Sequence, residues 1–134
     1  MKQLRALVRE DASPMTLETS EALDRLLSEA TAEAHSAGLL NIILLYGPND
    51  DHISLVVGGD ETVVGFNYGH GDPPYYASKG ADDSDDPVLT AYVNLKHHTE
   101  FPRRWVVPAE AGRRAAVEFL HTGARPTSLE WVEL

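Results

Sequence analysis

The chain has 134 residues, of which 43% are hydrophobic and 7% aromatic, and it carries a net charge of −10. This length fits one domain with its own core, and the apolar content is that of a folded protein. The absence of cysteine excludes disulfides, thiolate metal sites and cysteine nucleophiles. The N-terminus has no recognisable signal peptide and no apolar run is long enough to span a bilayer, so we expect a cytoplasmic protein with no membrane partner.

The negative charge is concentrated in one part of the chain. Residues 26–95 contain eleven acidic side chains and one basic side chain, Lys79, whereas the remaining residues carry ten of each. Nucleic-acid binding needs a basic surface, so we expect no nucleic-acid partner. The distribution favours a basic partner, because a surface of one sign steers association. The alternative is that the acids serve only solubility.

The chain begins with a predicted strand and a predicted helix. Residues 3–9 alternate loosely between apolar and polar side chains, which is typical of a strand, and residues 10–15 form a turn region. Thr19 or Ser20 can cap the helix that follows, and Gly38 ends it. The apolar residues of this helix recur at intervals of three and four, as an amphipathic helix requires: Leu23, Leu26, Leu27, Ala30 and Ala34.

A meander of three strands is predicted next. Its strands are residues 41–46, 52–57 and 62–68, and the turn residues glycine, proline, asparagine and aspartate lie between them. Two apolar or alternating runs joined by so short a turn predict a hairpin. Residues 75–78 are expected to form a short edge strand.

The second half of the chain adds strands and one more helix. Residues 88–96 alternate well and predict a strand, and residues 103–107 and 128–133 predict two others. Pro108 suits the first position of a second helix, and Gly123 suits its end. The apolar face of this helix is expected to contain Ala111, Ala115, Ala116, Phe119 and Leu120.

These elements together predict a single α+β domain over residues 1–134. Its architecture is an antiparallel β-sheet meander with two α-helices packed on it. No internal repeat and no long linker divides the chain.

The histidines are the first candidates for chemistry. His97 and His98 are adjacent, and neighbours in a strand point to opposite faces, so they are poorly placed to ligate one metal together. A site made by His70 and Asp72 with one of this pair is the alternative hypothesis, which would make the chain a small metal-binding protein or metal-dependent enzyme. No nucleophile or phosphate-binding motif is present, so we predict no enzyme, no catalytic residue and no cofactor.

The segment 75–87 is the strongest candidate for binding. It places four carboxylates within the five positions 82–86, and like charges this dense repel one another, so the loop is expected to stay solvated and to point outward. Two tyrosines precede the loop, and tyrosine is favoured at interfaces. A calcium loop is a minor alternative. The predicted partner-binding residues are Tyr75, Tyr76, Ser78, Asp82, Asp83, Asp85 and Asp86.

The same segment opens an ordered set of short motifs. They are Tyr76-Ala77-Ser78-Lys79-Gly80, the acidic loop, Tyr92, His97-His98-Thr99-Glu100-Phe101-Pro102, Val107-Pro108, Phe119, Gly123-Ala124-Arg125-Pro126 and Glu130-Trp131. In this order the motifs resemble the first immunity-protein family (Imm1-type) of bacterial polymorphic toxin systems, most clearly from Tyr75 to Trp131. The resemblance implies a small antidote that binds and blocks a cognate toxin, often a nucleic-acid deaminase, and it implies binding and not catalysis.

The resemblance and the charge distribution together suggest a mechanism. A toxin that acts on DNA or RNA needs a basic substrate groove, which an acidic protein can fill as a phosphate mimic. We expect the four aspartates to pair with toxin lysines and arginines while Tyr75 and Tyr76 serve as apolar anchors. Asp50-Asp51 and Asp60-Glu61 are alternative acidic contact faces, the oligomeric state is open, and a subunit of a larger assembly is a third interpretation.

Overall fold

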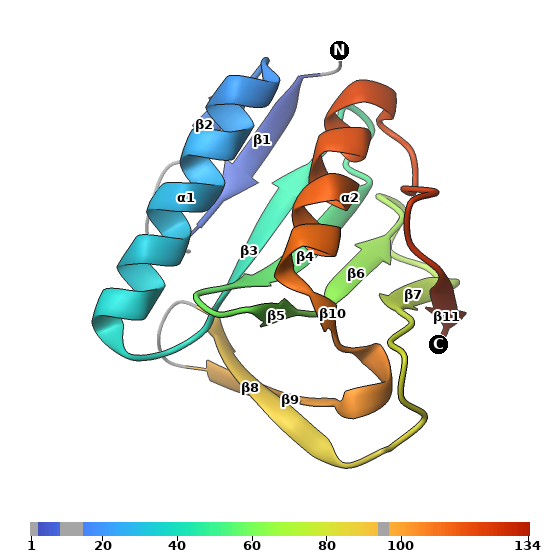
Figure 1. Cartoon of the computed structure of the whole chain (residues 1–134). Coiled ribbons are helices and arrows are strands. Elements are labelled where there is room, and N and C mark those ends of the chain that lie inside the picture. The colour runs from blue at the N-terminus through green and yellow to red at the C-terminus, as the bar shows by residue number, and fades with distance from the viewer. Residues whose placement is uncertain (1–2, 9–14, 94–96) are drawn as a thin grey trace.

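The computed structural model describes residues 3–8, 15–93 and 97–134, and Figure 1 shows both helices on one face of a twisted sheet. The end of the first predicted strand at Arg9, most of the turn region before Met15 and the end of the strand predicted for 88–96 lie outside the described residues. The main sheet has the strand order β11-β7-β6-β4-β3-β1-β2, and neighbours along this path are antiparallel. The predicted α+β class is therefore confirmed.

The strands of the main path follow the predicted positions in most places. The β3–β4 hairpin is confirmed, with Asn41 opposite Val57 and Tyr46 opposite His52. The seven strands of the path are β1 (Leu4–Leu7), β2 (Met15–Leu17), β3 (Asn41–Tyr46), β4 (His52–Val57), β6 (Val64–Asn67), β7 (Tyr75–Ser78) and β11 (Trp131–Glu133).

Helix α1 (Ser20–Ala37) has the predicted ends. The hydroxyl of Thr19 accepts a hydrogen bond from the backbone N–H of Ala22, and Gly38 ends the helix in the left-handed conformation with φ 73°. All five apolar residues predicted for the helix face are buried. This face packs on the strands, and the periodicity of the sequence therefore identified it correctly.

Helix α2 (Ala109–Thr122) starts after Pro108 and ends at Gly123, whose φ is 69°. We predicted that Ala111 would belong to the buried face of this helix, but Ala111 is only half-buried and Gly112 is buried instead. A Cβ at Gly112 would lie 2.8 Å from the Thr62 methyl group, so only glycine lets the helix approach this closely. Phe119 on α2 meets Phe66 on β6 edge to face, with ring centroids 6.4 Å apart, at the centre of the core.

A ribbon made by β8 (Pro87–Val93) and β9 (His97–Pro102) covers one end of the sheet face opposite the helices. It joins the sheet where Asn41 pairs with Tyr92 in parallel. Leu89 and Ala91 of the ribbon pack in a second core with Val56 of β4, and half-buried Ile42 of β3 lies against this core. Figure 1 shows the ribbon at the lower end of the molecule.

Several predictions about the strands were wrong in part, and the strand predicted for 128–133 forms only at β11. Residues 103–107 form a 3-10 turn, η1 (Arg103–Trp105), followed by β10 (Val107–Pro108), because the Val106 N–H closes on the Arg103 carbonyl. β7 is not an edge strand, since β11 pairs with it. Met15, placed in the turn region, begins strand β2.

A further difference is a break in the strand predicted for residues 62–68. It divides into β5 (Glu61–Thr62), which pairs with β10, and β6. The Thr62 hydroxyl accepts a hydrogen bond from the Val56 N–H and donates one to the Val56 carbonyl. At this point, hydrogen bonds to a side chain therefore take the place of backbone hydrogen bonds between the two strands. The break turns β5 away from the main sheet. No helix in the described part of the chain combines the length and apolar character needed to cross a lipid bilayer.

Candidate functional site

The acidic loop, residues 79–86, connects β7 to β8. The four aspartate side chains at 82, 83, 85 and 86 are all exposed, as the charge repulsion predicts. The backbone of the loop, however, is bound to η1. The Arg104 N–H donates to the Ser84 carbonyl and the Arg103 N–H to the Asp86 carbonyl, both at 3.0 Å. The carboxylates are therefore presented outward by a loop with a defined shape.

Gly80 allows the loop and η1 to approach closely. Its N–H donates to the Arg104 carbonyl at 2.6 Å. A Cβ at Gly80 would lie 2.4 Å from the Val106 carbonyl oxygen and 3.1 Å from the carbonyl oxygens of Arg103 and Arg104. Any side chain would push the loop away from the turn that holds it.

The fold adds further acids to the loop. A hollow of about 580 Å³ lies beside it, and carboxylates from three segments line this hollow: Asp60 and Glu61 at β5, Asp82 in the loop and Glu130 before β11. The pairing of β10 with β5 and of β11 with β7 brings these segments together. We call Asp60, Glu61, Asp82, Asp83, Asp85, Asp86 and Glu130 the acidic surface.

Three basic side chains lie within the acidic surface, and two of them are paired with its acids. Arg103 binds Glu61 at 2.8 Å and Arg104 binds Asp85 at 2.9 Å, whereas Lys79 lines the hollow. Exposed pairs of this kind contribute about 0–1 kcal/mol to stability. Their clearer effect is on geometry, since they orient two of the carboxylates. The surface keeps an excess of negative charge.

The two tyrosines predicted as anchors lie on opposite faces of the sheet. Tyr75 pairs across the ladder with Asn67 and Tyr76 with Phe66, and paired residues share a face. Tyr75 is 38% exposed on the face away from the helices, and its hydroxyl donates to the Gly71 carbonyl at 2.8 Å. It stands at the opposite end of β7 from the acidic loop.

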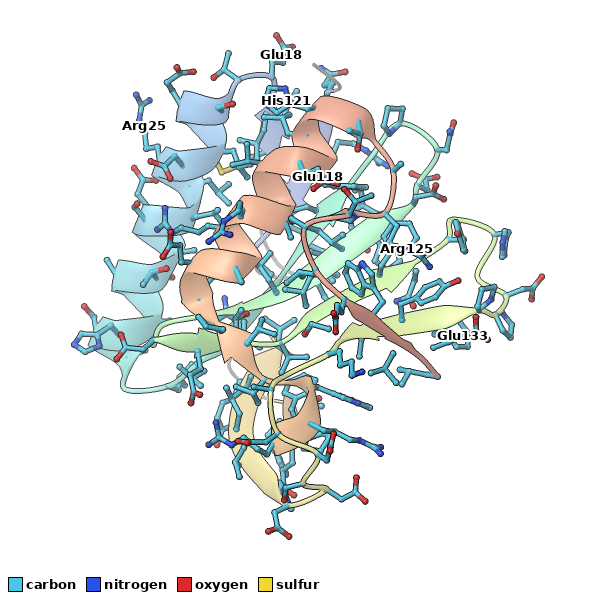
Figure 2. All side chains as sticks on the ribbon, turned by 45° about the vertical axis from the view of Figure 1, so that its right-hand side comes forward. Glu18, Arg25, Glu118, His121, Arg125 and Glu133 are labelled. Carbon is cyan, nitrogen blue, oxygen red and sulfur yellow. The ribbon has the colours of Figure 1, made fainter. Side chains whose placement is uncertain are left out.

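Tyr76 faces the helix side and is largely covered. The Arg125 guanidinium lies 4.0 Å above its ring, and Phe66, Tyr68 and Trp131 surround it. Figure 2 shows Arg125 in the segment between α2 and β11, well above the ribbon that marks the lower end of the molecule. Tyr76 is therefore packed among aromatic side chains on the helix side of the sheet, whereas Tyr75 faces the other side.

Ser78, the third non-acidic residue predicted for the site, has no exposed surface. Its hydroxyl accepts a hydrogen bond from the Val64 N–H at 3.0 Å and donates one to the Trp105 carbonyl at 2.7 Å. Ser78 thus joins β6, β7 and η1. Its place in the structure is beneath the acidic loop, where it supports the turn that binds the loop.

The histidines do not form a metal cluster among the described residues, which contain no group of three potential metal-ligating side chains. His70 and Asp72 are close, but the His70 Nδ1 accepts the Asp72 backbone N–H at 2.9 Å, and the ring stacks on Tyr68. His98 lies on β9 beside Tyr92. The side chain of His97 is outside the described residues.

Glu118 on α2 binds the segment that leads to β11. Its carboxylate accepts hydrogen bonds from the Thr127 backbone N–H, from the Thr127 hydroxyl at 3.0 Å and from the Ser128 N–H at 3.1 Å. Desolvation opposes its ionisation, but the hydrogen bonds from Thr127 and Ser128 together outweigh this effect and lower the pKa of Glu118. The ionised carboxylate therefore fixes the approach to β11, beside which Glu130 lies.

Comparison with known proteins extends the resemblance noted from the motifs. No curated protein matches the chain. The family model described as "Immunity protein Imm1" matches residues 11–133, which include the first helix and the meander as well as the motifs after Tyr75. The chain therefore belongs to the Imm1 family of immunity proteins.

Proposed function

We propose that this immunity protein neutralises a cognate nucleic-acid-deaminase toxin by covering the toxin's basic substrate site with the acidic surface. It acts as a binding protein and not as an enzyme, in the cytoplasm, where it contacts neither nucleic acid nor membrane. The observation that carries the proposal is the convergence of acids from three segments beside a loop whose backbone is held by η1.

Charge supports this choice of partner surface. Seven acidic side chains surround Lys79, Arg103 and Arg104, and both arginines are already paired. A one-signed surface of this kind raises association rates with an oppositely charged partner by about 10- to 1,000-fold. A toxin groove that binds nucleic acid carries the opposite charge, because it must neutralise phosphates.

Loop geometry supports it as well. Ordering a mobile side chain at an interface costs about 0.5–1.5 kcal/mol, so a loop that is already shaped loses less on binding. The Arg103 and Arg104 N–H groups hold the backbone at Asp86 and Ser84, and Gly80 fixes the start of the loop. The backbone that carries the aspartates is therefore held in place before the toxin arrives.

The test is a charge-removing variant with a matched control. Fourfold Asp→Asn substitution at 82, 83, 85 and 86 removes four charges while keeping side-chain size. The control is fourfold Glu→Gln substitution at Glu18, Glu21, Glu29 and Glu33, on or just before α1, which changes the net charge equally. Association with a catalytically inactive form of the toxin encoded beside this gene is measured at low and high salt.

We expect the loop variant to associate at least about tenfold more slowly than the control at low salt, and the difference to shrink at high salt, where the Debye length falls to about 3 Å. Growth rescue during toxin co-expression should weaken in parallel. Equal rates for the two variants would refute the acidic-surface mechanism. A toxin that deaminates neither DNA nor RNA in vitro would refute the proposed toxin class.

A further inference from the structure

A row of aromatic and polar side chains crosses the sheet face opposite the helices. The pairing register places Arg5 opposite Tyr46, Tyr46 opposite His52, His52 opposite Asn67 and Asn67 opposite Tyr75. Directly paired residues share a face, so these side chains form one line across β1, β3, β4, β6 and β7. We call these five residues the cross-sheet row.

Contacts between neighbours hold the row in place. The Arg5 guanidinium lies 5.6 Å from the centroid of the Tyr46 ring, and the Tyr46 and His52 rings are 4.9 Å apart. The Asn67 amide nitrogen lies 3.5 Å from the His52 Nε2, and the Tyr75 hydroxyl is bound to the Gly71 carbonyl. The side chains are ordered before any partner binds, which lowers the cost of binding.

Within the described residues, the β8–β9 ribbon packs over the end of this face that holds Ile42 and Val56. The cross-sheet row lies four residues further along β3 and β4, at Tyr46 and His52. Its members are half-buried or exposed, and Tyr75 is among the most exposed large apolar side chains of the described chain. Tyrosine and arginine are enriched at the energetic centres of protein interfaces.

Charge identifies the class of partner for this row. Asp50, Asp51 and Asp72 lie in the loops at its border, and Arg5 is already paired with Asp50. Aromatic rows on sheets can stack nucleic-acid bases, but a phosphate backbone would meet these carboxylates without a free basic partner in the row. A second copy of this chain would carry the same net charge of −10 and be repelled. A protein with a basic surface meets neither obstacle.

We propose that the cross-sheet row is a second docking surface for the toxin, binding a basic and partly apolar segment of it. This proposal rests on the proposed function. In it the acidic surface speeds association with the toxin, and the cross-sheet row adds affinity. Tyr75 begins β7 and the acidic loop follows its other end. Four residues of strand span about 13 Å, and an interface of ordinary size buries about 800 Å² on each partner. One toxin domain can therefore contact both ends of β7.

The experiment compares Asn67→Arg and Tyr75→Ala with Ala32→Arg, an exposed position on α1. Asn67→Arg places a bulky cation within the row, between His52 and Tyr75, and Ala32→Arg makes the same charge change on the helix side. The probe is the inactive toxin domain encoded beside this gene, and Kd is measured at about 0.5 M salt, where charge steering is screened. Urea unfolding of each free variant checks that it folds.

We expect each row variant to raise Kd at least about tenfold through faster dissociation, and Ala32→Arg to leave it unchanged. Hydroxyl-radical labelling of the wild-type chain should also fall at Tyr75 in the complex, a readout that needs no variant. Row variants that bind within twofold of the wild type, with Tyr75 labelled equally in both states, overturn this proposal alone. A wild-type chain that does not bind the toxin overturns both proposals.

Discussion

Replacement of Ser78 by alanine removes the hydroxyl that joins three segments beneath the acidic loop. The β6–β7 ladder ends at the Gly65–Ala77 pair, so the Val64 N–H takes its hydrogen bond from the Ser78 oxygen instead of from a strand. The same hydroxyl donates to the carbonyl of Trp105 in η1. Alanine can replace neither bond, and no solvent reaches this position, which is 0% exposed.

The cost follows from the two groups that lose their partner. A buried backbone group left without a hydrogen bond costs about 1–3 kcal/mol. With about 1–2 kcal/mol for each of the two groups, from the lower part of this range, we expect Ser78→Ala to lower the free energy of unfolding by about 2–4 kcal/mol. Domains of this kind have a total stability of about 5–15 kcal/mol, so the variant should still fold at room temperature. At about 3 °C per kcal/mol, its Tm should fall by about 6–12 °C.

Urea unfolding monitored by circular dichroism measures this loss, with Ser36→Ala on the exposed side of α1 as the matched control. The control should unfold within about 0.5 kcal/mol of the wild type, as surface substitutions usually do. A Ser78→Ala midpoint equal to that of the control would refute the supporting role. Loss of toxin affinity with unchanged stability would instead indicate direct contact by Ser78, as the sequence first suggested.

Three further substitutions test the contacts that shape the acidic loop, hold the segment before β11 and cover Tyr76. Gly80→Ala should separate the acidic loop from η1, lower the free energy of unfolding by about 1–3 kcal/mol and slow toxin association, measured by urea unfolding and stopped flow; an unchanged association rate would contradict the role of loop shape. Folding lowers the pKa of Glu118, so the ionised carboxylate should stabilise the protein at pH values above its ordinary pKa of 4.5. This stabilisation should disappear as the pH falls through the pKa of the folded state. Glu118→Gln should therefore be less stable than the wild type at pH 7, and the difference in the free energy of unfolding should vanish in acid. Arg125→Ala should remove the cation above the Tyr76 ring and lower the free energy of unfolding by about 0.5–1 kcal/mol in thermal unfolding, and a larger loss would indicate a further role for the guanidinium.

The sequence predicted those elements whose signals are local. Helix α1 has a capping threonine, a regular apolar period and a terminal glycine, and each of them acts within one turn of the helix. The β3–β4 hairpin likewise follows from two apolar runs and a short turn. The break at 62–68 comes from hydrogen bonds between the Thr62 hydroxyl and the backbone of Val56 on the neighbouring strand, which no local pattern reports. The turn at 103–105 closes through its own backbone, and the Ser78 hydroxyl then binds its Trp105 carbonyl from 27 residues away.

The candidate site likewise combines features that the local sequence predicts with features that depend on pairing between distant segments. Charge density alone predicted that the four loop aspartates would be exposed, because repulsion acts between neighbours in the chain. Glu130 joins them only because β11 pairs with β7, a contact across more than 50 residues. The sequence could also have predicted that Tyr75 and Tyr76 lie on opposite faces of the sheet, since adjacent residues of a strand point to opposite faces.

The two proposed surfaces can be separated by kinetics, because they act on different steps of binding. Removal of loop charges should slow association in a salt-dependent way, whereas substitution in the cross-sheet row should speed dissociation at any salt concentration. The sites share no described contact, since Tyr75 begins β7 and the acidic loop follows its other end. The effects of substitutions more than about 7–10 Å apart usually add. A variant that combines the four loop Asp→Asn changes with Tyr75→Ala should therefore lose as much binding free energy as the two separate variants lose together. A combined loss much smaller than the sum would mean that one toxin segment depends on both ends of the strand, and that the acidic loop and the row form a single site.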